Sequence, residues 1–563
     1  MDKQKLIISL YKALFTVVMI IGYKVLFGPS NVCIGLMVAF SAISFLKLDF
    51  TLYPVYRSTV FIILSFFLLI MSFIAGLNPF IGLIINVFTL FIVSYIYMKD
   101  SKSMISYLFL FIYIYMVSTP ITIELIPERL LSLLFGIFII IVSQFLFNKN
   151  KFKTSSSSII VEGLYTIKDE IENVISNSSN YDKTSIMDTK LRKLLNLIND
   201  QNSSIIFSTV LLKPYFNIAV TLERLPIVLN KMATSTNVID REQFLKDVNI
   251  EISNVINILL KKKCTTCTNF SFKYKDLLTE SDCAKECAEL IKILYLNISV
   301  LNNPLTRMKI SLKDVFKNME DFKRNSIGFN FSIKVAIAVS FSLFFVHLFN
   351  IRNGNWIVIT IYVLLQPFAS DTIIKTKKRV KGTIIGVFLS IIIFGVFQSH
   401  IPESLLLIPV LFLYFYATDY YIKVIFTCIL SLSINLSTGT LEYLSIGRFS
   451  FIIIGCVIAL LFNKYFMPYD ATLHTNSLKE KYLKLSNAMT DELSNIINGT
   501  SDENTLIKLA LNCNSIESKL LITANSSNDS SLKEILDTEY KTISSIRFCI
   551  LNIYSSKLER SLS

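Results

Sequence analysis

Twelve apolar segments, arranged in two blocks of six, limit what this chain can fold into. The first block lies near residues 6–27, 32–47, 59–77, 79–98, 104–123 and 129–147, and the second near 330–349, 355–370, 383–398, 404–418, 422–438 and 447–466. A helix needs roughly 17–25 residues to cross the hydrocarbon core of a bilayer. We therefore expect twelve membrane helices, the shorter of which extend into their flanks or lie buried among their neighbours.

The composition supports a membrane protein. Hydrophobic residues make up 53% of the 563 residues, only 17% are charged, and the mean hydropathy is +0.56. Soluble domains carry about 25% charged residues, so a soluble protein, a disordered chain and a small disulfide scaffold are all excluded. The sequence predicts an all-α polytopic fold. The net charge of +14 indicates Lys and Arg held at the cytoplasmic face, and we expect no nucleic-acid partner.

The positions of the basic residues predict the orientation. Lys3 and Lys5 precede the first span, Lys149 follows the sixth, and a basic run at 375–381 fills the connection after the eighth, whereas the alternate connections carry almost no charge. Loops rich in Lys and Arg stay in the cytoplasm. We expect a multi-pass protein of the cell membrane (inner or plasma membrane) with both termini cytoplasmic.

Four regions follow from this pattern. Residues 1–148 form the first membrane block and 326–468 the second. Residues 149–325 and 469–563 are polar and have apolar positions at a helical period, which predicts two cytoplasmic helical domains.

The two membrane blocks share an internal repeat. Three pairs of charged residues are each separated by 322 positions, and a further Arg–Gly pair recurs with a similar offset. The matched pairs are Lys12 and Lys334, Asp49 and Asp371, Arg57 and Arg379, and the stretches Arg129–Gly136 and Arg448–Gly455. Both copies begin on the cytoplasmic side, so we expect parallel six-helix repeats. Transporters often place the substrate path where such repeats meet.

The second block carries a specific motif, which starts with a basic residue in one span and continues through the next two. Its residues are Lys334, Trp356, Thr360, Gln366, Pro367, Arg379, Gly382, Thr383 and Gly386. This pattern, together with the order of six spans, helical domain, six spans and tail, resembles the fusaric acid resistance and aromatic acid exporter superfamily, including its bacterial inner-membrane members. The resemblance implies export of organic anions, often aromatic carboxylates. Plant relatives of similar architecture are anion channels.

The ionisable residues within the spans also favour anions. Lys12, Lys24, Lys334, His347 and Arg448 lie in apolar stretches, and no Asp or Glu lies near the middle of a span. Charges in a bilayer usually face an interior or a cavity. A carboxylate could meet Lys334 as a point charge and Arg379 as a bidentate partner. The alternative is that the lysines snorkel to the inner surface.

Other motif residues have a structural alternative. Arg379 could instead pair with Asp371 or Asp49. Gly382 and Gly386 share a helix face and permit close packing, and we group Thr383 with them as a structural motif. Only Lys12, Asp49 and Arg57 represent the motif in the first block.

The eighth span is expected to present a broken helix to the substrate path. Trp356, Thr360 and Pro367 fall on one helical face, and Pro367 frees the carbonyl group of Val363. Gln366 falls on a different face, and Trp356 could instead be an interfacial anchor.

Four cysteines in the central polar segment suggest a metal site. Cys264, Cys267, Cys283 and Cys287 have the spacing C-x2-C-x15-C-x3-C, whereas a zinc ribbon has two C-x2-C pairs. Reduced structural thiols are the alternative, and no other cofactor is expected.

Three functions stay open from the sequence. The first is efflux of organic anions, aromatic carboxylates among them, with the bilayer and a small anion as partners. The second is an anion channel, and the third is a membrane scaffold or sensor that acts through its helical domains. We expect no enzymatic activity, and a homo-oligomer is compatible with each reading.

Overall fold

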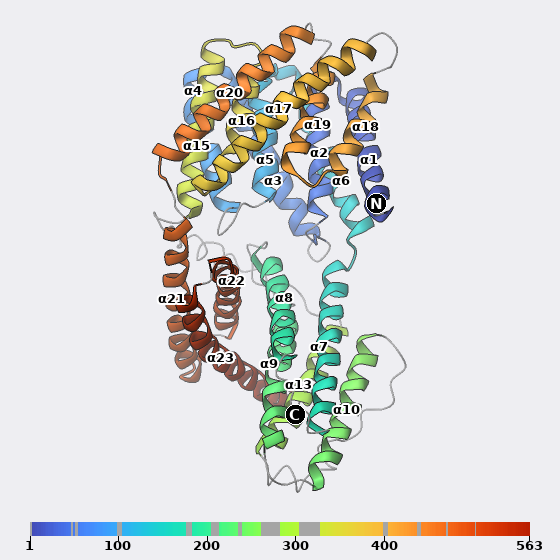
Figure 1. Ribbon diagram of the computed structural model, residues 1–563, viewed down its shortest axis with the longest axis vertical. Helices are drawn as coiled ribbons and strands as arrows, with labels where there is room; N and C mark the ends of the chain where they lie inside the picture. Colours follow the sequence, from blue (N-terminus) through green and yellow to red (C-terminus); the bar gives the residue numbers. More distant parts are fainter. Residues whose placement is uncertain are drawn as a thin grey trace. The chain divides into compact units, whose positions relative to one another are not determined.

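The structure is a computed structural model. It describes all residues except 1–2, 47–48, 51–53, 98–103, 176–182, 204–212, 235–238, 261–281, 303–326, 398–402, 436–440, 469–470, 501–502, 528 and 563. Throughout the described residues the regular secondary structure is helical, which confirms the all-α prediction (Figure 1). The chain forms two compact units. One comprises Met1–Asn150 and Phe322–His474, and the other comprises Lys151–Asp321 and Thr475–Ser563.

The first unit contains a helix for each of the twelve predicted spans. The first block has α1 (Lys3–Phe27), α2 (Val32–Phe45), α3 (Pro54–Leu77), α4 (Pro79–Tyr97), α5 (Met104–Ser118) and α6 (Ile126–Phe147); the second has α15 (Ile327–Leu348), α16 (Asn355–Leu364), α17 (Ala369–Phe397), α18 (Glu403–Tyr416), α19 (Tyr420–Asn435) and α20 (Leu441–Tyr465). Within the described residues, six helices are long and apolar enough to cross a membrane, and five shorter ones are apolar. This is a multi-pass membrane protein.

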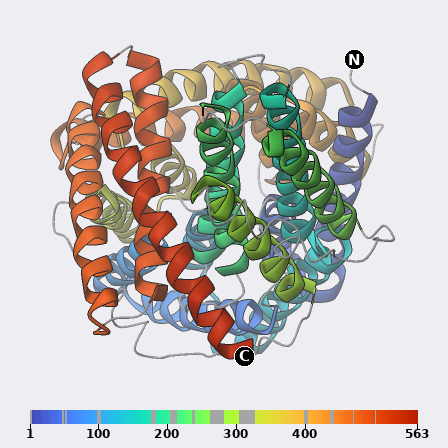
Figure 2. The ribbon, with the colours of Figure 1, turned by 90° about the horizontal axis from the view of Figure 1, so that it is seen from below.

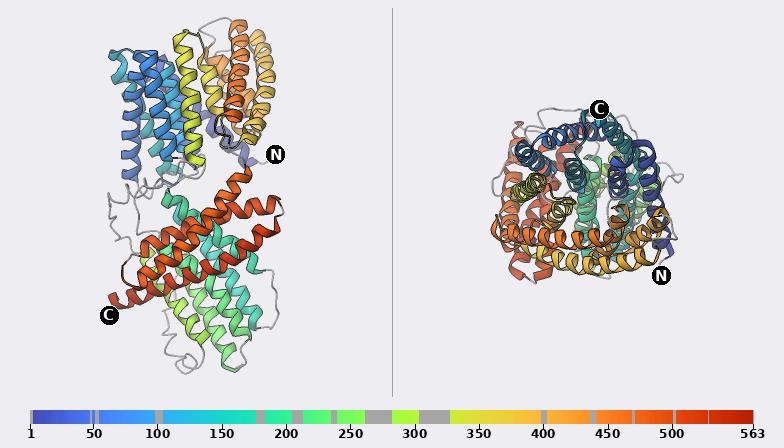
Figure 3. Two further views of the ribbon diagram at one scale, coloured as in Figure 1. Left: turned by 90° about the vertical axis from the view of Figure 1, so that its left-hand side faces the viewer. Right: turned by 90° about the horizontal axis from the view of Figure 1, so that it is seen from above.

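The helices of the two blocks make matching contacts. Helix α2 packs on α6 as α16 packs on α20, and α3 contacts α5 and α6 as α17 contacts α19 and α20. The blocks also contact each other in a reciprocal way, since α1 packs on α18 and α15 packs on α4. Seen from above, α17 and α20 lie side by side along one edge of this unit (Figure 3, right).

Two sequence predictions need correction in the second block. The eighth span is not a helix over 355–370, because α16 ends at Leu364 after ten residues. Proline disfavours the helical conformation of the residue that precedes it, so Pro367 stops the helix before its own position. The next helix then begins at Ala369. The basic run at 375–381 consequently lies on α17 and not in a connecting loop.

The second unit is a helical bundle built from both polar segments. Its helices are α7 (Lys151–Ile175), α8 (Lys183–Ser203), α9 (Lys213–Thr234), α10 (Ile239–Leu259), α13 (Asp282–Asn302), α21 (Ala471–Ile497, whose first residues belong to the other unit), α22 (Glu503–Ser527) and α23 (Ser530–Leu562). Helix α22 packs on α8 and α23 packs on α9 (Figure 2). Ion pairs join these helices, namely Arg192–Glu517 at 3.0 Å, Lys213–Glu503 at 2.6 Å and Arg547–Glu223 at 3.2 Å.

Candidate functional site

The break between α16 and α17 exposes carbonyl groups that polar side chains then satisfy. The carbonyl oxygen of Val363 accepts a hydrogen bond from Lys375 Nζ at 2.8 Å and one from Gln366 Nε2 at 3.2 Å. Gln366 Nε2 also donates to the carbonyl of Leu365 at 2.8 Å. The carbonyl that the sequence identified as freed by Pro367 is therefore bonded within the protein. Lys375, which the sequence grouped with the topological charges, has a specific contact here.

Lys334 is held at this break through a second side chain. It is only 1% exposed, and its Nζ donates to Asn463 Oδ1 at 2.7 Å. The Nδ2 atom of Asn463 donates to the carbonyl oxygen of Phe368 at 3.3 Å. Lys334 does not reach solvent along its helix, so the snorkelling alternative does not describe it. Its burial beside a neutral amide instead leaves a positive charge inside the membrane unit.

Arg379 lies between α16 and α19 and is 7% exposed. Its Nη1 donates to the hydroxyl of Tyr420 at 3.3 Å, and its Nη2 donates to Thr360 Oγ1 at 3.5 Å. Nε has no hydrogen-bond partner among the described residues. The arginine therefore contacts the hydroxyl groups of Tyr420 and Thr360. The structural alternative predicted from the sequence was an ion pair with Asp371 or Asp49. Asp371 is exposed in the first turn of α17, where it complements the helix dipole.

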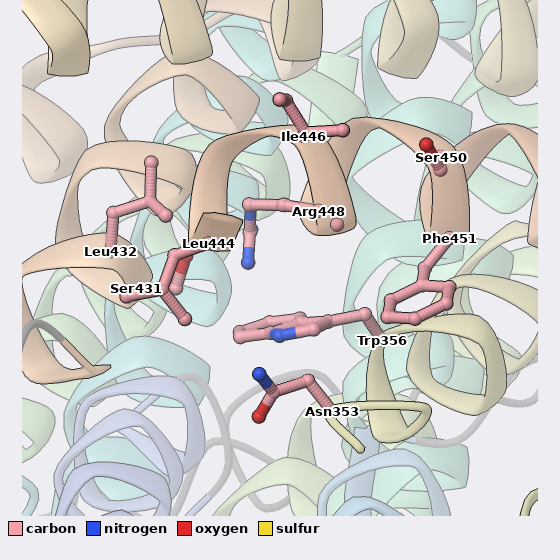
Figure 4. Close-up of a pocket in the computed structure, with 10 residues that line it drawn as sticks. Asn353, Trp356, Ser431, Leu432, Leu444, Ile446, Arg448, Ser450 and Phe451 are labelled. Atoms are coloured by element: carbon pink, nitrogen blue, oxygen red, sulfur yellow. The ribbon is translucent and has the colours of Figure 1, made fainter. Parts of the chain in front are cut away.

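A second buried arginine lies over the only tryptophan of the protein. The guanidinium carbon of Arg448 is 3.9 Å from the centroid of the Trp356 ring. Arg448 comes from α20 and Trp356 from the start of α16, and both line a pocket of about 300 Å³ (Figure 4). Trp356 thus contacts the guanidinium of Arg448 within the protein. The sequence-based alternative, in which Trp356 anchors the helix at the membrane interface, did not predict this contact.

The motif glycines allow α17 and α19 to approach each other closely. A Cβ atom on Gly382 would lie 2.5 Å from the carbonyl oxygen of Tyr421, and one on Gly386 would lie 2.8 Å from Cβ of Cys428. Neither position has room for a side chain. Thr383, next to Gly382, is buried.

The first block does not bring its motif residues to the same place. Lys12 is partly exposed on α1, and Arg57 on α3 stacks over Phe50 at 4.9 Å, close to the buried Asp49. Lys12 lies on α1 and Arg57 on α3, whereas Lys334 lies on α15 and Arg379 on α17. The site that the structure assembles belongs to the second block.

The cysteine cluster is only half described. Cys264 and Cys267 lie outside the described residues, and Cys283 and Cys287 occupy one face of α13. Burial raises the pKa of Cys287 to about 12, with further contributions from Glu286 and Cys283. Burial therefore favours the neutral thiol of Cys287 over the thiolate.

Sequence reasoning missed several residues of this site. Arg448 was noted as one of the cations in the spans and as part of the repeated Arg–Gly pair, but nothing in the sequence connected it to Trp356. The available signal was the recurrence of the Arg–Gly pair in both blocks, which indicated that Arg448 occupies a specific position on its helix. Tyr420 gave no signal in the sequence. The only signal for Asn463 was the Leu-Phe-Asn-Lys stretch that closes both blocks, at 146–149 and 461–464.

Comparison with known proteins gives a match in the second membrane block, which contains the candidate site. Residues 339–462 match the family model described as fusaric acid resistance protein-like. The second membrane block is therefore similar to that family. The match contains Trp356, Thr360, Arg379 and Arg448, and Lys334 lies just before it. No curated protein and no solved structure matches the chain.

Proposed function

We propose that this protein is a membrane transporter that exports small organic anions, aromatic carboxylates among them. One observation carries the proposal: three buried cations in the second block, Lys334, Arg379 and Arg448, lack a carboxylate partner among the described residues. Charges inside a membrane protein are costly and usually serve a substrate path. A path with uncompensated positive charge attracts anions and disfavours cations.

The arrangement suits a carboxylate. Arg379 has a planar fork of donors, and two of its nitrogens bond hydroxyl groups that are themselves mobile donors and acceptors. A carboxylate that replaces one of these hydroxyls would gain a charge-assisted hydrogen bond, which is stronger than the neutral one. We assign Arg379 to anion contact and Lys334, with Asn463, to positioning the break between α16 and α17.

The membrane orientation is part of the proposal. The distribution of Lys and Arg supports a cytoplasmic location for both termini and for the segment 150–325, with the protein in the cell membrane. Arg379 then lies toward the cytoplasmic half, where an exporter first captures its substrate.

An ancient duplication of the membrane block also fits the contacts. Asn148 Nδ2 donates to the carbonyl of Leu46 at 3.0 Å, as Asn463 Nδ2 does to that of Phe368. The two acceptors are 322 residues apart, the same offset that relates the charged pairs. Gly136 likewise packs against Val38, as Gly455 packs against Thr360, and Val38 and Thr360 are again 322 apart.

A growth-inhibition screen tests the proposed function. A strain that lacks this protein is compared with the complemented strain across aromatic and aliphatic acids and their neutral amides. We expect increased sensitivity to one or more acids and unchanged sensitivity to the amides. If the acid in complemented cells only equilibrates with the electrochemical gradient across the membrane, the protein acts as a channel. Equal sensitivity to every acid would contradict anion export.

A further inference from the structure

We propose that the pocket between Arg448 and Trp356 is a second anion site, distinct from Arg379. It takes the carboxylate of a small organic acid on Arg448 and the apolar body of that acid against the pocket wall. The inference deepens the proposed anion transport and rests on it, but its test below does not use transport.

Arg448 has donors that the protein leaves unused. The residue is 3% exposed, and its Nη2 donates to the carbonyl oxygen of Thr427 at 3.4 Å. The guanidinium also contacts the Cys428 thiol, but Nε and Nη1 have no hydrogen-bond partner among the described residues. Burying a charged donor without an acceptor is strongly unfavourable. A bound carboxylate supplies the missing acceptors and the missing negative charge in one group.

Trp356 orients the guanidinium for such a ligand. The guanidinium carbon of Arg448 lies over the Trp356 ring at cation–π distance, so the indole helps to fix the position of the charged group. Nε and Nη1 have no acceptor among the described residues, so both donors are available to a carboxylate. Figure 4 shows Arg448 over the indole, with Ser431 and Leu432 beside the guanidinium.

The shape and lining of the pocket set the size and character of the ligand. About 300 Å³ is at the lower end of the range for small-molecule sites. Leu432, Leu444 and Phe451 supply apolar surface, whereas Asn353, Ser431 and Ser450 are the neutral polar residues. One charged end and a compact apolar body fit this lining.

The corresponding arginine of the first block has more hydrogen-bond partners within the protein, although its Nη2 has none among the described residues. This arginine, Arg129, donates from Nε to Asn31 Oδ1 at 3.4 Å and from Nη1 to the carbonyl of Thr119 at 2.8 Å. The amide of Asn31 also donates to the carboxylate of Glu128 at 3.2 Å. The first copy therefore contains a carboxylate of its own beside the arginine.

The second copy lacks that carboxylate. The residue before Arg129 is Glu128, whereas the residue before Arg448 is Gly447, and Gly447 lines the pocket. Asn353 is 322 positions after Asn31 and also lines the pocket. An acid from solution would occupy the place that a glutamate side chain fills in the first block.

The two arginine sites are neighbours along α16. Trp356 contacts Arg448, and Thr360, four residues later, contacts Arg379. Four residues of an α-helix span about 6 Å. The residues that contact the two arginines are thus about one helical turn apart on α16.

Fluorescence of the single tryptophan tests binding directly. The purified full-length protein, in nanodiscs of zwitterionic lipid, is titrated with cyclohexanecarboxylate, and the neutral cyclohexanecarboxamide serves as the matched probe. We expect a saturable change in Trp356 emission with the acid and none with the amide. Arg448→Gln should weaken binding at least about tenfold, since it removes a charged hydrogen-bond partner. Lys378→Gln, an exposed change on α17, should leave binding unchanged.

A second variant keeps Arg448 in place. Gly447→Glu restores the carboxylate of the first block, and among the described residues only Phe451, at 3.8 Å, approaches a Cβ at that position. We expect this variant to fold and to lose the response to the acid. Wild-type titration without any change in emission, or an undiminished response in Gly447→Glu, would overturn the second site even where export is intact. A response to anionic lipid alone, with none to the acid, would also overturn it.

Discussion

The ammonium group of Lys334 lies 2.7 Å from Oδ1 of Asn463, and this contact joins α15 to α20. Through Nδ2, Asn463 then bonds the carbonyl of Phe368 in the break between α16 and α17. A residue that sequence analysis singled out for its charge therefore also fixes the backbone beside the proposed anion path.

Removal of Asn463 should destabilise the membrane unit. Asn463→Leu leaves the Lys334 ammonium buried without its acceptor, so we expect a loss of about 1–3 kcal/mol and a lower melting temperature in detergent. In Lys334→Met/Asn463→Leu both polar groups are replaced, and part of the loss should be recovered. Thermal unfolding of the purified variants measures this. A double variant that is no more stable than Asn463→Leu alone would argue against a specific Lys334–Asn463 interaction.

Gly382 should not accept even a methyl group. In Gly382→Ala the new Cβ would lie 2.5 Å from the backbone oxygen of Tyr421, so α17 and α19 must separate. Overpacking of this kind costs about 1–3 kcal/mol, and the melting temperature should fall. Gly447→Ala is the matched control on α20, since its nearest heavy atom is 3.8 Å away, and it should be neutral or slightly stabilising. Equal melting temperatures for the two variants would contradict the close approach.

The buried ion pair of the second unit should hold α23 against α9. Arg547 and Glu223 have almost no exposed side-chain surface, and Arg547→Met leaves Glu223 charged and unpaired, which costs about 3–5 kcal/mol. Limited proteolysis of the full chain should then cleave α23 faster. Lys484→Met breaks an exposed pair with Glu480 and should change nothing measurable. Unchanged cleavage of Arg547→Met would show that the pair does not anchor the tail.

The proposed topology can be checked at Cys549. This cysteine is exposed on α23, whereas Cys513 on α22 is buried and unsuited to labelling. A membrane-impermeant maleimide should modify Cys549 only after the cells are permeabilised. The Cys549→Ser variant identifies the labelled band. Modification of Cys549 in intact cells would place the C-terminus outside and refute the orientation derived from Lys and Arg.

The sequence predicts the membrane helices well because the bilayer imposes length and apolarity on each one. It does not predict where α16 ends, because Val363, Leu364 and Leu365 continue the apolar run. The helix stops there because of the effect of Pro367 on the residues that precede it. The individual motif residues were visible, but their partners were not. Arg448 meets Trp356 only because α20 packs on α16, and no local pattern encodes that contact.

The most direct test of anion export through the second block is uptake of a labelled acid by inverted membrane vesicles, with the acid taken from the growth screen. Arg379→Ala should abolish uptake, and Arg379→Lys should impair it nearly as much, because it keeps the charge but loses the planar fork. Lys377→Ala and Lys378→Ala, which change exposed residues of the same helix, should transport normally. We predict no uptake by Lys334→Ala/Arg379→Ala at normal abundance on an immunoblot. Full uptake by that double variant would contradict the account and leave both residues as structural anchors.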